Sequence, residues 1–168
     1  SIFSPSPITT KVTIIGMAVD TTDSPDMLYV LAMGGTIDKD YPRLTSGYAF
    51  EFGDEPAASR ILNSHPNLGL SYECTSICKR DSLEITTADR QALLAAIKDI
   101  LFNRKNNSAR ILVTHGTDTM IETALYIKKH LHEEKLYDCG YIAFTGATKP
   151  ERFVDSDASF NVGSAVTA

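Results

Sequence analysis

The stretch MLYVLAMGG at 27–35 decides the fold of this chain. Seven apolar residues follow one another without polar alternation and stop at two glycines. A run of this length that is apolar on both faces is typical of an interior strand in a parallel sheet. Glycine directly after such a strand permits a tight turn and a close approach of another backbone. The stretch therefore predicts a buried parallel strand with a tight turn at its carboxyl end.

Strand-like and helix-like patterns alternate along the rest of the chain. Between 86 and 101 leucine and isoleucine recur at helical spacing, and Thr86 with Asp89 approximates a capping box at the start of that helix. Further strands are expected at 11–19, 69–77, 110–114 and 140–145, and further helices at 54–63 and 119–136. Such alternation predicts βαβ units with right-handed crossovers. The expected fold class is α/β: a mostly parallel twisted sheet flanked by helices, of the three-layer Rossmann or flavodoxin-like type.

Length and composition exclude several classes of protein. The chain has 168 residues, of which 43% are hydrophobic and 22% charged, and its formal net charge is -5. It is long enough for one compact domain, and no apolar stretch approaches the roughly 20 residues of a membrane-spanning helix. A mildly acidic balance without a run of Lys or Arg argues against nucleic acid as a partner. Because three cysteines make no disulfide framework and no secretion signal is recognised, we expect a cytoplasmic location.

One junction occurs three times. VLAMGGTID at 30–38, LVTHGTDTM at 112–120 and IAFTGATKP at 142–150 each run from an apolar strand into glycine and then threonine. In a parallel sheet all three junctions lie at the carboxyl ends of strands, where such folds bind ligands. The chemical groups gathered there are those of Thr36, Thr117, Asp118 and Lys149. Threonine beside Asp and Lys suggests acyl transfer by an activated hydroxyl, with backbone N–H groups holding the oxyanion.

These residues also carry a resemblance to a known family. AMGGTID at 32–38 and THGTDTMIETA at 114–124 resemble the two signature motifs of bacterial-type L-asparaginases. TGATKP at 145–150, followed by SDASFNVGSAV at 156–166, is similar to the strand, turn and helix that come after the second motif. The resemblance covers only the N-terminal domain of that family, as in its short single-domain "mini" members. It implies a catalytic domain of the asparaginase N-terminal type at 27–168, preceded by an extra arm and strand at 1–26.

The resemblance implies a role for individual residues. Thr36 matches the nucleophile, and Tyr48 matches the tyrosine that activates it from a lid over 37–52, for which Tyr41 is the weaker candidate. Thr117 and Asp118 match the pair that supports the attack. Lys149 stands in for a lysine of the family that has no direct counterpart here. Substrate binding is expected from Gly35, Asp81, Ser82 and Gly116. The resemblance implies no metal and no organic cofactor.

The function expected from this resemblance is hydrolysis of L-asparagine to L-aspartate and ammonia. Two alternatives stay open. The first is a binding module for aspartate or asparagine that has lost the chemistry, and the second is an amidase that acts on glutamine or another amide. Apart from the small-molecule substrate, the partner that we expect is a second copy of the chain. A homodimer is favoured over a tetramer because it would cover an exposed edge strand. No nucleic acid and no membrane are expected as partners.

Overall fold

The computed structural model describes residues 12–14, 27–41, 50–103 and 109–168. Its centre is a five-stranded sheet with the order β1-β7-β6-β2-β5. The strands are β1 (Val12–Ile14), β2 (Met27–Gly34), β5 (Ser71–Arg80), β6 (Ala109–Thr114) and β7 (Gly140–Thr145). The pairs β2–β5, β2–β6 and β6–β7 are parallel, and β1 runs antiparallel to β7. The predicted fold class is confirmed: an α/β domain with a mostly parallel sheet.

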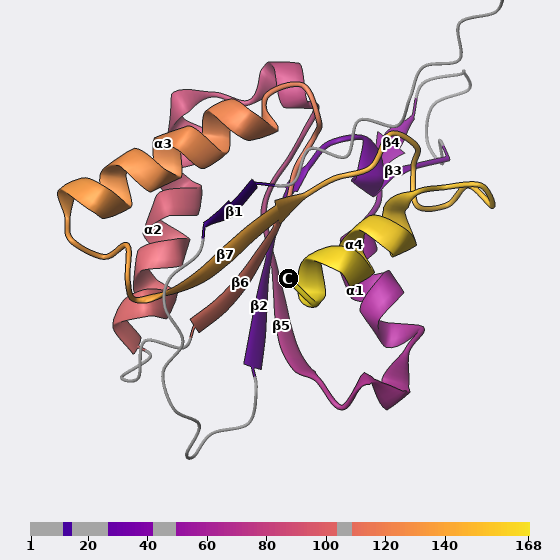
Figure 1. Cartoon of the computed structure of the whole chain (residues 1–168). Coiled ribbons are helices and arrows are strands. Elements are labelled where there is room, and N and C mark those ends of the chain that lie inside the picture. The colour runs from indigo at the N-terminus through magenta and orange to yellow at the C-terminus, as the bar shows by residue number, and fades with distance from the viewer. Residues whose placement is uncertain (1–11, 15–26, 42–49, 104–108) are drawn as a thin grey trace, which may run out of the picture.

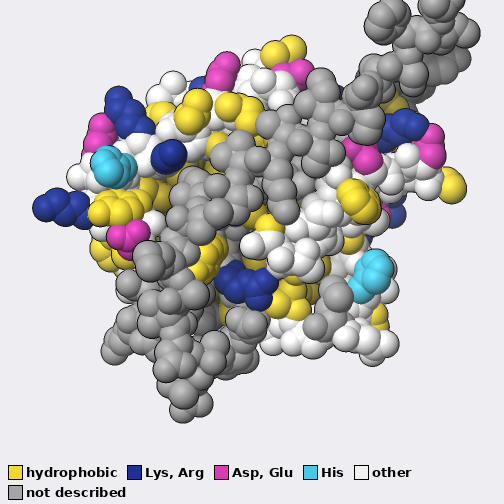
Figure 2. Space-filling view, viewed as in Figure 1, with side chains coloured by type: hydrophobic (Ala, Val, Ile, Leu, Met, Phe, Trp, Pro, Cys, Tyr) yellow, Lys and Arg dark blue, Asp and Glu magenta, His cyan; other side chains and the backbone are white. Residues whose placement is uncertain are grey.

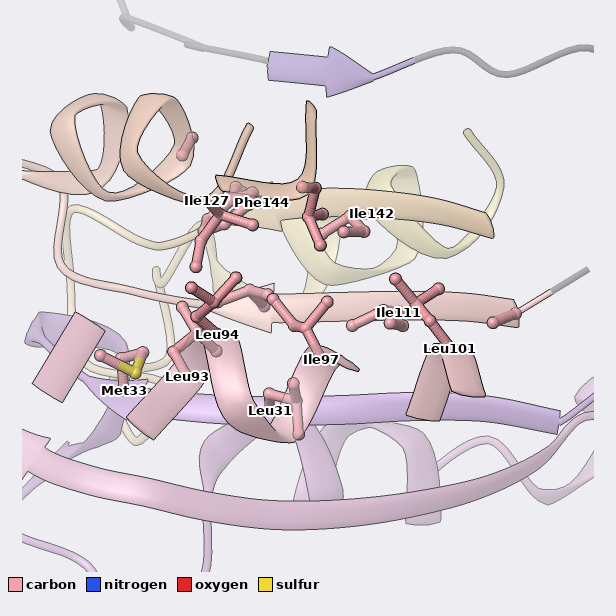
Figure 3. Packing of buried hydrophobic residues seen from close by; sticks show 14 of the residues in the cluster. Leu31, Met33, Leu93, Leu94, Ile97, Leu101, Ile111, Ile127, Ile142 and Phe144 are labelled. Atoms are coloured by element: carbon pink, nitrogen blue, oxygen red, sulfur yellow. The ribbon is translucent and has the colours of Figure 1, made fainter. Parts of the chain in front are cut away.

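Helices cover both faces of the sheet (Figure 1). The pair α2 (Thr87–Asn103) and α3 (Met120–Glu133) packs on one face, and the pair α1 (Ala57–Asn63) and α4 (Ala158–Val166) packs on the other. Figure 3 shows the larger core, in which Leu31, Ile111 and Phe144 of the sheet meet Leu94 and Ile97 of α2. Strand β2 contributes Leu31 and Met33 to one core and Leu28 and Val30 to the other, so it is covered on both faces, as the apolar run at 27–33 predicted.

The start of α2 has the capping arrangement expected from its sequence. The backbone N–H of Thr86 donates to Asp89 Oδ2 over 2.8 Å, and the N–H of Asp89 donates to Thr86 Oγ1 over 3.3 Å. Both bonds satisfy donors that the first helical turn leaves open. The predicted start of this helix is confirmed.

The segment after β2 differs from the expected irregular loop. It begins with the 3-10 turn η1 (Thr36–Asp38), and β3 (Lys39–Asp40) then pairs antiparallel with β4 (Glu51–Phe52). The resulting ribbon lies beyond the carboxyl ends of the sheet strands (Figure 1). Two residues a strand are too few to produce a periodic pattern, which is why the sequence did not indicate this ribbon. Tyr48 and the rest of the predicted lid at 42–49 lie outside the described residues.

Two further 3-10 turns, η2 (Pro66–Leu68) and η3 (Ser82–Glu84), flank β5. That strand begins and ends later than the predicted 69–77, so its carboxyl end lies directly before Asp81 and Ser82.

None of the helices in the described part of the chain is long and apolar enough to cross a membrane. On the face seen in Figure 2, acidic and basic side chains are interspersed over the surface that is coloured.

A buried carboxylate joins the turn after β2 to helix α1. Asp38 is 6% exposed, and its Oδ1 accepts the backbone N–H of Ala57, the first residue of α1, over 2.6 Å. Burial raises the pKa of Asp38 from 3.8 to about 6, although the Ala57 N–H and the nearby Arg60 act in the opposite direction. The turn that carries Thr36 is thus fixed to α1 through an ionisable group.

We predict a pH-dependent contribution of Asp38 to stability. Because its pKa is raised in the folded state, the carboxyl stabilises the fold most below about pH 4, and this stabilisation is lost as the pH rises through about 6. The free energy of unfolding of the wild type, minus that of Asp38→Asn, should fall by about 2–3 kcal/mol between pH 4 and pH 7.5. Urea unfolding at both pH values measures it. The same difference for Asp138→Asn, at an exposed position, should stay constant. A constant difference for Asp38→Asn would contradict the prediction.

Candidate active site

The parallel strands bring the predicted site residues to one edge of the sheet. Gly35 follows β2, Asp81 follows β5, Gly116 lies two residues beyond β6, and Lys149 lies in the turn after β7. Ladder pairs hold these ends level: Ala32 of β2 lies opposite Thr114 of β6, which lies opposite Thr145 of β7. The carboxyl edge of such a sheet is the usual position of a ligand site in α/β proteins.

The first two junctions touch through glycine backbones. A Cβ atom on Gly35 would lie only 2.3 Å from the backbone nitrogen of Gly116 and 2.4 Å from its Cα. Gly35 also has a φ of 84°, which L side chains rarely adopt. Its N–H donates to the carbonyl of Arg80 over 2.8 Å, so β5 joins the same contact. Thr36 and Thr117 therefore start from backbones that are in direct contact.

The second junction also packs on the turn after β5. A Cβ on Gly116 would lie 2.5 Å from the Cβ of Ser82, which is 2% exposed. The Ser82 hydroxyl donates to Asp118 Oδ2 over 2.6 Å, and the Thr119 hydroxyl donates to the carbonyl of Ser82 over 2.6 Å. These two bonds fix the orientation of the Asp118 carboxylate, while Asp118 itself stays exposed to solvent.

The hydroxyls of Thr36 and Thr117 differ from those of Ser82 and Thr119 in their hydrogen bonding. Thr36 is half-buried and Thr117 is exposed. Neither hydroxyl makes a hydrogen bond to a residue that the structure describes. The hydroxyls of Ser82 and Thr119 are bonded within the protein, and the unbonded hydroxyl of Thr114 is fully buried, so the hydroxyls of Thr36 and Thr117 are the ones available to a ligand.

A buried relay supports the Gly116 turn from behind. The hydroxyl of Thr123 accepts the Nε–H of Arg90 over 3.1 Å and lies 2.9 Å from His115 Nε2. Its own proton therefore points to Nε2, which leaves the proton of His115 on Nδ1, 2.8 Å from the carbonyl oxygen of Gly116. Burial lowers the pKa of His115, which keeps the ring neutral. No motif of the sequence indicated that Thr123 and Arg90 support this turn.

Lys149 has a different partner from the one its predicted role requires. Its ammonium group contacts the carboxylate of Asp155, and both side chains are largely exposed. In the part of the chain that the structure describes, Lys149 makes no hydrogen bond to Thr36 or Thr117. Asp157 accepts the backbone N–H groups of Thr148 and Lys149, at 3.0 and 3.2 Å. Lys149 is thus held within its own turn.

Asp157 orders the turn after β7 through its two backbone N–H partners. Its side chain makes no capping bond to α4, whereas the Ser156 hydroxyl accepts the backbone N–H of Ala158 over 3.1 Å. Burial acts to raise the pKa of Asp157, but the bonds from the N–H groups of Thr148 and Lys149 hold it below the ordinary value. Tyr41 is 58% exposed and stacks on Phe153 with 5.9 Å between ring centroids.

Among the described residues no group of three His, Cys, Asp or Glu side chains could hold a metal ion. One apolar pocket lies at the opposite end of the sheet, where β7 begins. It is lined by Leu101, Lys128, Leu131, Leu136, Tyr137, Gly140 and Ile142. It contains none of the predicted site residues.

Fold and site together define a class of protein. Free hydroxyls and an oriented carboxylate at the carboxyl edge of a parallel sheet are typical of an α/β domain that binds a small polar ligand. The model of the family described as "Asparaginase, N-terminal" matches residues 27–168. The chain belongs to this family, which confirms the resemblance seen in its motifs.

Individual relatives cover the chain well but are longer than it. The glutaminase-asparaginase of Acinetobacter glutaminasificans is 26% identical over 139 residues, which make up 82% of this chain and 40% of the relative. The fold is similar to that of the thermostable L-asparaginase from Thermococcus kodakarensis (TM-score 0.64, 22% identity, 84% of this chain and 40% of that one). A probable cytoplasmic L-asparaginase from Campylobacter jejuni gives a TM-score of 0.57 at 21% identity, over 84% of this chain and 38% of that one. The chain thus spans about 40% of the length of these relatives.

We predict that Gly116→Ala disrupts the site and destabilises the fold. The added methyl group would overlap the Ser82 side chain, so the free energy of unfolding should fall by about 1–3 kcal/mol. Gly163→Ala is the matched control, because a Cβ there meets nothing within 4 Å and lies within α4. It should stabilise the protein by about 0.5–1 kcal/mol. Urea unfolding measures both, and a Gly116→Ala variant as stable as wild type would contradict the packing described above.

Proposed function

We propose that this domain is an amidohydrolase that converts L-asparagine to L-aspartate and ammonia. The observation that carries the proposal is the Gly35–Gly116–Ser82 packing, which places Thr36, Thr117 and an oriented Asp118 at one edge of the sheet. The names of the relatives, which are asparaginases or a glutaminase-asparaginase, support the substrate class. The name of the Campylobacter jejuni relative supports the cytoplasm as the location.

In the proposed mechanism the hydroxyl of Thr36 attacks the side-chain amide carbon of the substrate. The new C–O bond replaces the C–N bond, the hydroxyl proton leaves with the nitrogen as ammonia, and a β-aspartyl ester remains on Thr36. Water then cleaves the ester, releases L-aspartate and restores the hydroxyl. Backbone N–H groups of the Gly-Thr turns would hold the oxyanion of each step.

The other predicted residues have supporting roles in this proposal. Thr117 and Asp118 bind the substrate and support the attack, with the bond from Ser82 fixing the Asp118 carboxylate. Asp81 and Ser82 line the part of the site that receives the amino-acid end of the substrate. Tyr48 would activate Thr36. Lys149 would assist Thr117 only after leaving Asp155, its partner in this structure.

Two observations favour the alternatives. The Lys149–Asp155 contact favours a binding module for aspartate or asparagine, because it leaves Thr117 without a lysine partner. The name of the Acinetobacter relative favours glutamine as a second substrate. One assay distinguishes all three functions, since a binding module releases no ammonia and a glutaminase releases it from glutamine.

We predict that the purified protein releases ammonia from L-asparagine and that Thr36→Val lowers turnover more than about 100-fold with little loss of L-aspartate binding. Thr75→Val, at an exposed position on β5, is the matched control and should behave like wild type.

Tyr48→Phe should lower turnover far more than it lowers the affinity for L-aspartate. A Lys149→Met variant with full turnover would remove Lys149 from the mechanism. Wild-type protein that binds L-aspartate without releasing ammonia would establish the binding module instead.

We further propose that the chain forms a homodimer, with a tetramer as the alternative. β5 has ten residues and pairs with β2 on one side, while no strand of the described chain pairs with its other side. An edge of this length is commonly covered by another chain. Light scattering at micromolar concentration should give twice the 18.3 kDa of one chain. The mass of a single chain, with activity intact, would refute the proposal.

A further inference from the structure

An ion pair connects the ribbon after Thr36 to the candidate site. Lys39 Nζ lies 2.5 Å from Asp81 Oδ2, and the two side chains are 24% and 35% exposed. Lys39 begins β3, and its backbone N–H donates to the carbonyl of Thr36. The hydrogen bond from Lys39 holds the pKa of Asp81 below its usual range, so Asp81 is an anion at neutral pH. Lys39 directly follows the first strand–Gly–Thr junction, and this ion pair links it to the turn after β5.

The pair belongs to a short chain of polar contacts that ends at Asp118. From Asp81 Oδ1 the hydroxyl of Ser82 is 3.5 Å away, and the same hydroxyl donates to Asp118 Oδ2 over 2.6 Å. Two carboxylates thus face one hydroxyl group. Like charges that share a hydroxyl partner repel each other and any anionic ligand group. A cation beside Asp81 offsets half of this charge.

Neighbouring cations are bonded elsewhere. Lys79 donates to the backbone carbonyl of Asp54 over 3.2 Å, and Arg80 pairs with Asp89 over 3.3 Å. Lys149 pairs with Asp155. Within the described ranges, Lys39 is the cation that contacts Asp81, which is linked through the Ser82 hydroxyl to Asp118. Its ammonium has three donors, of which Asp81 occupies one, so donors remain for a ligand.

We infer that Lys39 is a specificity-determining residue, whose ammonium group offsets the Asp81 and Asp118 carboxylates and lets the site accept an amino acid with a net negative charge, such as L-aspartate. This inference rests on the proposed function, because L-aspartate is the product of the proposed reaction. The expected consequence is selective: loss of Lys39 weakens ligands in proportion to their negative charge.

The test compares two ligands that the protein does not hydrolyse. L-Aspartate carries a net charge of about -1 at pH 7, and L-homoserine is a neutral zwitterion of similar size. Isothermal calorimetry on Lys39→Met should show about tenfold weaker binding of L-aspartate and about threefold or less for L-homoserine. Lys39→Arg, which keeps the charge, should bind both within about threefold of wild type.

Lys98→Met is the matched control. Lys98 pairs with Glu134 between α2 and α3, and its side chain is 25% exposed, nearly the same as that of Lys39. Its loss should leave both affinities unchanged. Lys39→Met/Asp81→Asn restores the net charge of the site and leaves no unpaired carboxylate at position 81. The ratio of its L-aspartate affinity to its L-homoserine affinity should lie within about threefold of the wild-type ratio, and this ratio carries the test if Lys39→Met alone does not fold.

The outcomes separate the inference from the proposed function. Equal weakening of both ligands in Lys39→Met, or no rescue in the double variant, overturns the inference while the proposed function stands. Equal weakening would mean that the ion pair only holds the β3–β4 ribbon in place. A wild-type protein that binds neither L-aspartate nor L-homoserine refutes the proposed function, and the inference is refuted with it.

Discussion

The candidate site depends on one steric constraint: the backbones at Gly35 and Gly116 approach so closely that neither residue has room for a side chain. The parallel pairing of β2 and β6 brings the two junctions level, and the missing Cβ atoms let them touch. Gly116 in turn packs on Ser82 at the end of β5. Three strands thus bring their polar residues to one place. A single methyl group added at Gly35 or Gly116 would push these strand ends apart.

Hydrogen bonds then fix the orientation of the polar groups on this packed backbone. The bond from Ser82 orients the Asp118 carboxylate, and the neutral ring of His115 holds the Gly116 carbonyl from the side of the core. Both bonds come from groups that are almost fully buried, where competition with water is weak. Next to these fixed groups, the hydroxyls of Thr36 and Thr117 make no hydrogen bond to a described residue. Rigid surroundings beside such hydroxyls are what the proposed mechanism requires.

The sequence predicted the elements that have a local pattern and missed features that leave no such pattern. The apolar run at 27–33 and the Thr86–Asp89 capping box each predicted an element that the structure confirms. The β3–β4 ribbon is too short for a periodic pattern. The part that Asp157 plays, and the pairing of Lys149 with Asp155, depend on how one turn folds back on itself.

Long-range contacts also explain what the sequence missed in the site. Lys39 and Asp81 are 42 residues apart, and Arg90 and Thr123 are 33 apart, so no spacing rule could pair them. The junction glycines were predictable because their position after a strand limits what they can do. The contact between Gly35 and Gly116 was not predictable, because it requires the order of the strands in the sheet.

A crystal structure of the protein with L-aspartate bound would show whether the packed junctions form the ligand site. We expect L-aspartate at the carboxyl edge of the sheet, in contact with Thr36, Thr117 and Asp118, with the two threonine hydroxyls within about 10 Å of each other. L-Aspartate bound elsewhere, or an ordered, closed site with these hydroxyls farther apart than about 10 Å, would contradict it, since groups that act on one ligand must reach it together.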